Sequence, residues 1–328
     1  MKKRQPHVPM ARFVEAMPET SGNAVNGLGE TEVRQASPFF WHPPKRQTHA
    51  ALQKDVIDYL QSCPEVAEVF SPKPPGGRGP ATVEQATEVE SGSAEDWSER
   101  VKAFALTNEA DLVGIARMDP AFVFDGYEIT EPWVIVVGVG MDYEELAQTP
   151  ATFENPVGAV VVGKEYNRAS RACKKLANFI LEAGYPAKAW PGPYASALNM
   201  IPAALAAGLG ELGKHGSIIN RTLGSRFRLS AVTTTMPLLS DEPDEFGIDD
   251  YCTRCNACTR ACPPDAIFEE KQTVRGVDKW YVDFDKCIPY FGETFGCGIC
   301  IVHCPWSRPG IADNILRKLA RSAARDDD

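Results

Sequence analysis

The apolar residues of the chain follow a regular pattern only from about residue 97 onward. Short apolar runs predict buried strands over 112–116, 133–137 and 159–162, and polar and apolar residues that alternate at the start of 227–234 predict a further strand. Apolar residues at helical spacing predict helices over 97–108, 168–183 and 198–207. Because strands and helices alternate along this stretch, we expect an α/β domain over residues 97–245.

The two ends of the chain show weaker patterns. Residues 1–96 contain scattered Pro, Gly and Asn, an amphipathic stretch over 50–63 that predicts a helix, and a loop over 71–95. We therefore expect residues 1–96 to form an extension and linker that wraps the domain or is partly irregular. Residues 311–328 alternate basic and apolar residues and end in aspartates, which predicts a surface helix as a C-terminal tail.

Cysteines carry the strongest chemical signal. Eight of the ten lie between Cys252 and Cys304, in two runs that each end in Cys-Pro. The first run has the spacing C-x2-C-x2-C-x3-C-P, which is typical of bacterial ferredoxins and whose fourth cysteine binds the other cluster. Crossing the fourth ligands predicts two [4Fe–4S] clusters in a ferredoxin-like domain over residues 246–310. Cluster one would use Cys252, Cys255, Cys258 and Cys304, and cluster two would use Cys262, Cys287, Cys297 and Cys300.

Structural zinc is the competing interpretation, because zinc sites also use pairs of C-x2-C. Zinc gives no reason for two interlocked triplets that each end in Cys-Pro. The pattern therefore favours clusters that pass electrons one at a time.

Two further motifs give weaker evidence about cofactor binding. Gly208, Gly210 and Gly213 match the dinucleotide fingerprint G-x-G-x-x-G, but that fingerprint needs a strand before it, and an apolar helix precedes it here. Arg226 and Arg228 alternate with apolar residues and so share one face of a strand. They could lie on a solvated edge or face a cavity, where they would bind an anion or a cofactor; spacing leaves both open.

Composition and charge exclude some classes of binding partner and indicate a cellular location. The formal net charge of −10 disfavours nucleic acid, because proteins that bind a phosphate backbone are usually basic. No apolar run reaches the roughly 20 residues that a transmembrane helix needs. The basic start of the chain is followed by no apolar segment of an export signal, so we expect a cytoplasmic location.

Several segments, in the right order, resemble the corrinoid and iron–sulfur reductive dehalogenases and their relative epoxyqueuosine reductase. These segments cover 110–116, 176–185, 207–216, 224–233, 280–287 and 297–306. The resemblance implies a nitroreductase-like α/β domain that binds cobalamin in its base-off form, beside the two clusters.

The resemblance also implies roles for single residues. Tyr166 would be the proton donor, with Arg226 as its basic partner and Arg228 as the second candidate; an ordinary wall position for Tyr166 stays open. Cofactor contacts are expected from Tyr194, Gly208, Gly210, Gly213, Lys214, His215 and Arg228. Phe39, Trp41, Trp190 and Trp306 are candidates for an aromatic substrate pocket, although core packing is the commoner role of each one taken alone.

The leading hypothesis is a reductive dehalogenase that cleaves a carbon–halogen bond in a small organohalide. Epoxyqueuosine reductase carries an aspartate in the segment that corresponds to 194–198, where this chain has no carboxylate. A tRNA-modifying reductase and an electron carrier without catalysis remain the alternatives. With no fused reductase in the sequence, electrons are expected from a separate ferredoxin, flavodoxin or reductase.

Overall fold

The computed structural model describes residues 7–192 and 196–317, and a four-stranded sheet lies at its centre. The strand order is β1 (Leu112–Arg117), β2 (Trp133–Gly140), β6 (Phe227–Thr234) and β3 (Ala187–Trp190). Every neighbouring pair is antiparallel, with Ile135 opposite both Ile115 and Val232. The strands predicted over 112–116, 133–137 and 227–234 are therefore confirmed.

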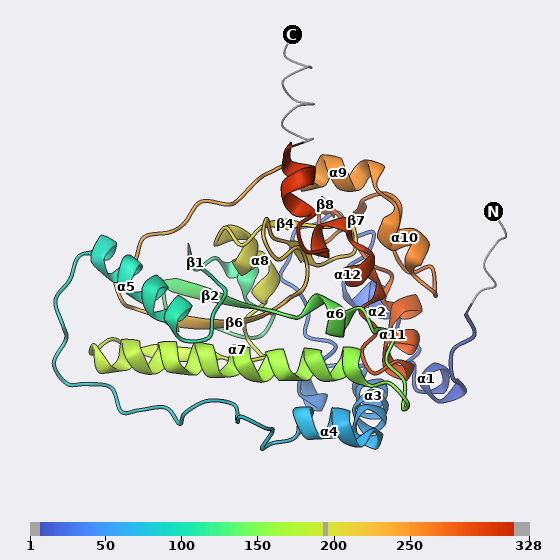
Figure 1. Ribbon diagram of the computed structural model, residues 1–328, viewed down its shortest axis with the longest axis horizontal. Coiled ribbons are helices and arrows are strands. Elements are labelled where there is room, and N and C mark those ends of the chain that lie inside the picture. The colour runs from blue at the N-terminus through green and yellow to red at the C-terminus, as the bar shows by residue number, and fades with distance from the viewer. Residues whose placement is uncertain (1–6, 193–195, 318–328) are drawn as a thin grey trace, which may run out of the picture.

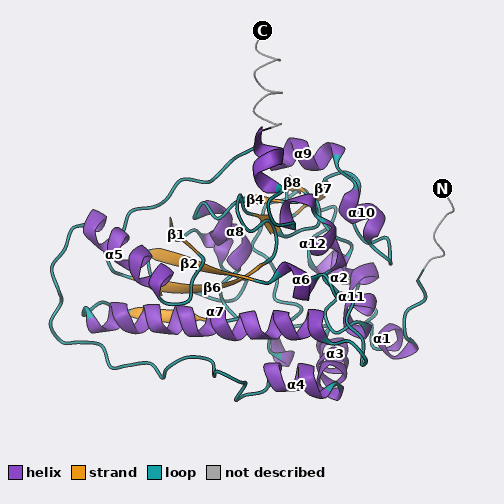
Figure 2. Cartoon of the chain, in the orientation of Figure 1, coloured by secondary structure: helices purple, strands orange, loops and turns teal. Residues whose placement is uncertain are grey.

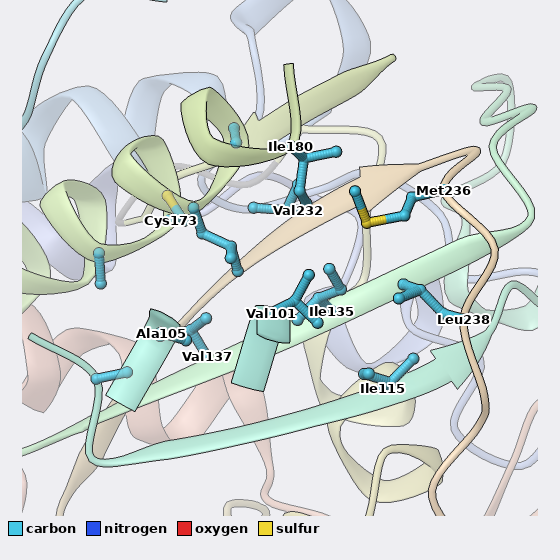
Figure 3. Packing of buried hydrophobic residues seen from close by; sticks show 14 of the residues in the cluster. Val101, Ala105, Ile115, Ile135, Val137, Cys173, Ile180, Val232, Met236 and Leu238 are labelled. Atoms are coloured by element: carbon cyan, nitrogen blue, oxygen red, sulfur yellow. The ribbon is translucent and has the colours of Figure 1, made fainter. Parts of the chain in front are cut away.

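Helices cover both faces of this sheet (Figures 1 and 2). The long helix α7 (Val157–Glu182) and α5 (Ala94–Thr107) lie on one face, where Ile135, Ile180 and Val232 form a buried core (Figure 3). The short helix α8 (Met200–Ala206) packs on the opposite face. The result is a mixed α/β fold in which helices pack against both faces of the sheet and a buried apolar cluster lies on each face.

The strand predicted over 159–162 is wrong, because these residues form the first turns of α7. Ala159 and Val161 are buried, but they pack against the N-terminal helices and the cysteine-rich module instead of pairing in a sheet. A run of four apolar residues cannot distinguish a strand from a buried helical turn. As a result α7 extends well beyond the predicted helix and reaches the cysteine-rich part of the molecule.

The N-terminal region packs mainly on the cysteine-rich module. Its helices are α1 (Ala11–Glu15), α2 (Gly22–Val25), α3 (Ala50–Ser62) and α4 (Pro64–Phe70), and α3 matches the helix predicted over 50–63. Helices α1, α2 and α3 contact α11 (Phe284–Glu293). The Asn23 side chain accepts a hydrogen bond from the Phe284 backbone at 2.8 Å and donates one to Asp283, also at 2.8 Å.

An extended segment then runs along α7 toward α5. The backbone N–H groups of Ala86 and Glu90 donate to the carbonyls of Leu181 and Ala183, each at 3.0 Å. The Asn178 side chain bonds the backbone of the same segment at Val83 and Ala81. This segment is irregular, yet it is fixed along its length by hydrogen bonds.

The cysteine-rich module follows the sheet domain. It contains α9 (Ile248–Arg254), α10 (Ala257–Ala261), β7 (Gln272–Val274), β8 (Val277–Lys279), α11 and α12 (Ile299–His303). The remaining short elements are α6 (Tyr143–Leu146), β4 (Glu211–Leu212), β5 (Ile218–Ile219) and the 3-10 turns Pro44–Arg46, Pro120–Phe122 and Pro305–Ser307. Residues 312–317 are helical, and the rest of the predicted tail helix lies outside the described residues.

No helix in the described part of the chain has the length and apolarity needed to cross a bilayer.

Candidate functional site

Four cysteine thiols gather in a first group. The pKa of Cys304 is raised to about 12, mainly by burial and in part by the nearby Cys252, Cys258 and Cys255. Burial likewise raises the pKa of Cys252 to about 11, with Cys258 and Cys255 again contributing. The structure therefore brings together the four thiols that the sequence assigns to cluster one.

The other four thiols form a second group beside the first. Burial raises the pKa of Cys287 to about 12, and Cys297 and Cys262 add to the shift. Burial also raises the pKa of Cys300 well above its usual value, followed by effects of Cys297, Cys287, Cys258 and Cys262. Because Cys258 belongs to the first group, the two groups adjoin.

Both groups consist of cysteine thiols, the side chains that bind iron–sulfur clusters. All eight cysteines are free thiols. Backbone N–H groups point at two sulfurs, from Lys214 to Cys252 and from Ala266 to Cys262, each at 3.4 Å. Hydrogen bonds to sulfur are typical of cluster sites. Because the free thiols hold their protons tightly, a cluster must displace those protons when it binds.

A cavity of about 620 Å³ separates the second thiol group from the sheet domain. On one side it is lined by Cys262, Cys287, Cys297 and Cys300, and on the other by α8, His215 and Arg228. Residues 26–36 of the N-terminal region complete the wall with Asn26, Val33, Arg34 and Ala36. The cavity lies within the size range of ligand pockets and places thiols directly on its surface.

Arg228 and Tyr166 meet at the end of this cavity. Arg228 Cζ lies 5.2 Å from the centroid of the Tyr166 ring, within the range of a cation–π contact. Arg228 lines the main cavity and also two smaller spaces of about 300 Å³ and 90 Å³, both of which Tyr166 lines too. Its Nε is buried with no hydrogen-bond partner among the described residues, so a polar ligand group could occupy that position.

Arg226 was predicted as the basic partner of Tyr166, but the structure places Arg228 beside that ring. Its Nη1 donates to the backbone carbonyl of Met141 at 2.8 Å, while the Met141 N–H donates to the carbonyl of Arg226. Arg226 lies one residue before β6 and is held at the end of β2. Its Nε is also buried without a partner among the described residues, but the cation beside Tyr166 is that of Arg228.

The 90 Å³ space is an aromatic pocket beside Tyr166. Trp41, one of the predicted pocket residues, lines it. Its other walls come from α3, α4, α7 and α11 and the loop after α11, through Ile57, Leu60, Gln61, Phe70, Val162, Phe291, Phe295 and Gly296. Sequence reasoning missed these residues. The only local signal was the amphipathic pattern of α3, which shows that one face is buried but not what it faces.

Three predicted pocket residues lie elsewhere. Phe39 packs edge-on against Phe284, with ring centroids 4.6 Å apart. Trp190, the last residue of β3, is buried and donates from Nε1 to Thr233 Oγ1 at 3.0 Å. Trp306 is 1% exposed and packs between Phe246 and Tyr251 near the first thiol group. These tryptophans were assigned by composition, and both serve the core.

The glycine-rich loop after α8 packs closely against the backbone of other segments. A Cβ at Gly210, which has φ +135°, would lie 2.1 Å from the carbonyl oxygen of Ile219. At Gly208 the corresponding contact is 2.5 Å, to the carbonyl oxygen of Glu242, and Gly213 faces the Ile219 side chain. The three glycines therefore bring this loop against other segments, instead of forming the cofactor contacts that were predicted.

Lys214 and His215 follow this loop and also differ from their predicted roles. Lys214 is 1% exposed, and its Nζ donates to Asn256 Oδ1 at 2.7 Å, beside the first thiol group. His215 lines the cavity, but both of its ring nitrogens are engaged, by the Ser217 N–H at 3.2 Å and by Ser225 Oγ at 3.1 Å. Burial lowers the pKa of His215 to about 4, so the ring is neutral. Tyr194, the remaining predicted cofactor contact, lies outside the described residues.

Comparisons with known proteins agree with this architecture. The family described as "4Fe-4S dicluster domain" matches residues 251–307. The tetrachloroethene reductive dehalogenase of Desulfitobacterium hafniense is 31% identical over 213 residues, which are 60% of this chain and 37% of that protein. The epoxyqueuosine reductase of Escherichia coli is 30% identical over 205 residues, 56% of this chain and 51% of that protein.

Solved structures show the same fold. The catabolic reductive dehalogenase NpRdhA, in complex with 3-bromo-4-hydroxybenzoic acid, superposes with a TM-score of 0.65 at 23% identity, covering 84% of this chain and 41% of that one. A reductive dehalogenase described in terms of B12-dependent dehalogenation gives a TM-score of 0.64, also at 23% identity, covering 83% of this chain and 38% of that one.

The chain thus spans about a third to a half of the length of the curated relatives that it matches. Within that span it combines a two-cluster module, a mixed α/β sheet domain and a cavity between them. The chain is a relative of the corrinoid and iron–sulfur reductive dehalogenases.

Proposed function

We propose that this protein is a cobalamin-dependent reductive dehalogenase that cleaves the carbon–halogen bond of a small organohalide. One observation carries the proposal: a single cavity has the thiols of cluster two on one wall and Arg228, beside Tyr166, on the other. Electron delivery and proton delivery would then meet in the same space. Neither zinc nor a passive electron carrier would need this arrangement.

The residues present fit the expected cofactors. Two [4Fe–4S] clusters would be held by the two thiol groups, and a corrinoid would lie in the cavity between α8 and the module, as in a nitroreductase-like domain. Residues of α8 that line the cavity, such as Ile201, Pro202 and Leu205, offer an apolar surface for a flat macrocycle. His215 offers no free ring nitrogen to the cavity, so we expect no cobalt ligand from it. When bound, the corrinoid supplies a strongly reducing, nucleophilic cobalt centre.

The protein's own groups would supply the proton and the electrostatics. Tyr166 lines both smaller spaces, where its phenolic hydroxyl would donate the proton. The guanidinium of Arg228 stabilises the negative charge left on that oxygen after proton transfer. Arg228 also offers its unpaired Nε to the departing halide.

The aromatic pocket would hold the substrate and exclude water. Its volume is about 90 Å³, and its lining is apolar except for Gln61, Tyr166 and Arg228. Burial of apolar surface is the main source of affinity in such a pocket. A compact halogenated molecule fits these walls better than an extended or highly charged one.

Halide release by protein reconstituted anaerobically with iron, sulfide and cobalamin tests this proposal, with a chemical reductant as the electron source. We expect turnover of compact organohalides, and a loss of about 10²-fold or more in Tyr166→Phe, which keeps the ring and removes the proton. Wild-type rates in Tyr166→Phe would remove Tyr166 from the mechanism.

Reduction of a tRNA nucleoside is the second candidate, because an epoxyqueuosine reductase is 30% identical over 205 residues. It predicts that a tRNA anticodon stem-loop binds the reconstituted protein and that queuosine forms. The net charge of −10 argues against this substrate. Queuosine formation without halide release would replace the dehalogenase proposal.

A further inference from the structure

An open hollow of about 630 Å³ lies on the side of the cysteine-rich module formed by α10 and α12. These two short helices pack against each other, as Figure 1 shows at the upper right. Small and apolar residues make up most of the surface, with a basic side chain at three positions. The lining consists of Thr149, Pro150, Ala257, Arg260, Ala261, Ile299, His303, Pro305 and Arg308.

The hollow is basic in an acidic protein. Arg260 and Arg308 are exposed, as is Arg254 on the neighbouring helix α9. The side chains of these three arginines form no ion pair or hydrogen bond with any other described residue. The lining contains no carboxylate, although the chain carries 44 acidic side chains and a net charge of −10. The local positive potential is therefore free to act on a partner.

This hollow lies next to the cluster ligands. Helix α10 contains Cys258 and ends one residue before Cys262, and Pro305 directly follows Cys304. Ile299, which precedes Cys300, lines both the hollow and the inner cavity. The module is thus approached from two sides, by the inner cavity at cluster two and by the outer hollow at α10 and α12.

We propose that this hollow is the docking site for a small, acidic, one-electron carrier protein. One electron would pass from the reduced carrier to an oxidised [4Fe–4S] cluster, which gains that electron, and no bond or proton changes. Side chains as small as Ala257 and Ala261 let a carrier come close to the cysteines. Arg260 and Arg308 would attract and orient an acidic surface, because complementary charge raises association rates.

An RNA partner fits this surface less well. Sequence-tolerant binding of unpaired bases relies on aromatic side chains for stacking, and the lining of the hollow contains no Phe, Tyr or Trp. Ion pairs with acidic side chains need only the exposed arginines. The observations therefore favour a protein carrier.

Reduction of the cluster-loaded protein tests the proposal without any substrate. Stopped-flow bleaching of the cluster absorbance would be measured with two separate donors, reduced two-cluster ferredoxin and reduced flavodoxin. In Arg260→Glu/Arg308→Glu, we expect the second-order rate with an acidic carrier to fall about tenfold or more at low salt, and the difference to shrink at high salt. Photoreduced deazaflavin, an uncharged donor, should reduce wild type and variant equally.

Lys73→Glu is the matched control. Lys73 is exposed and follows α4, which lies at the bottom of the view in Figure 1, far from α10. A similar loss in Lys73→Glu, or unchanged rates with both carriers in the arginine variant, would overturn the proposal. So would binding of an anticodon stem-loop that needs the two arginines while carrier reduction does not. If Arg260→Glu/Arg308→Glu binds less iron than wild type, Arg260→Gln/Arg308→Gln replaces it. We then expect about half the effect on the logarithm of the second-order rate, because each substitution changes the charge by one unit and not two.

This inference depends on the two-cluster module but not on the reaction in the cavity. Cluster reduction is measured before any carbon–halogen bond is offered. If the carrier result holds and no halide is released, the docking site stands and the dehalogenase proposal fails. If halide is released with a chemical reductant and the carrier result fails, the opposite conclusion follows.

Discussion

Replacement of Arg228 by Gln tests the charge beside Tyr166 most directly. The substitution removes the positive charge and keeps a polar side chain of related length. Arg228 Cζ lies 5.2 Å from the Tyr166 ring centroid. Two unit charges at about that distance interact by about 3 kcal/mol at an effective dielectric constant of about 20. If the phenolate carries most of a charge in the transition state, the chemical step should slow by about 10²-fold.

Single-turnover product formation, with protein reduced in advance, isolates that step from electron delivery. Arg228→Lys should recover part of the rate, because it restores a cation without the planar fork of a guanidinium. Arg226→Gln is the matched control, since it makes the same chemical change two residues away, where the guanidinium bonds the Met141 carbonyl. We expect Arg226→Gln to change the single-turnover rate less than about threefold while costing about 1 kcal/mol of stability.

The reasoning is refuted if Arg226→Gln slows the single-turnover rate as much as Arg228→Gln, or if Arg228→Gln stays within about threefold of wild type. Cobalamin content must be measured for each variant, because loss of the corrinoid would also reduce the rate. An Arg228→Gln variant that binds cobalamin normally and reacts at the wild-type rate would leave Tyr166 without an electrostatic partner.

Two further predictions concern the loop after α8. The pKa of His215 is lowered to about 4 from a usual value of 6.5, because burial disfavours the charged ring. The unfolded state therefore binds more protons below pH 6.5, and this contribution to stability, about 3 kcal/mol, is complete above pH 6.5 and is lost as the pH falls toward 4. His215→Gln should show a shallower loss of stability over that range in denaturant titrations, and an unchanged slope would contradict this role. Lys214→Met removes a buried cation beside the first thiol group. We expect a more negative midpoint potential for cluster one in an EPR-monitored redox titration, while cluster two moves less; equal shifts would point to a general structural effect.

Local sequence patterns predicted the parts of the fold that local chemistry determines. The spacing of the cysteines limits how a short chain can surround a cluster, and the eight thiols lie near one another, while their division into two ligand sets stays a prediction. Strands at 112–116 and 133–137 were predicted because each is a well-bounded apolar run, and the strand at 227–234 because polar and apolar residues alternate at its start. The run at 159–162 has the same composition but continues into α7, and only tertiary packing decides between the two structures.

The candidate site was harder to predict because it is assembled from distant segments. Trp41, Phe70, Tyr166 and Phe295 come from four separate parts of the chain and meet in one pocket. Arg226 and Arg228 share a strand face in the sequence pattern, but only β-sheet pairing shows that Met141 engages one of them. Trp190 and Trp306 were predicted as pocket residues and lie in the core. The sequence does not distinguish an aromatic residue that packs in a core from one that lines a pocket.

Two [4Fe–4S] clusters and one corrinoid per chain, with cluster two facing the cavity of the corrinoid, are the proposed cofactor set. Quantification of iron and cobalt in anaerobically reconstituted protein, together with its visible spectrum, tests that claim most directly. We predict about eight irons and one cobalt per chain, as expected for two cubanes and one corrinoid. Eight irons with no uptake of cobalt would contradict the claim and leave an iron–sulfur electron carrier in its place.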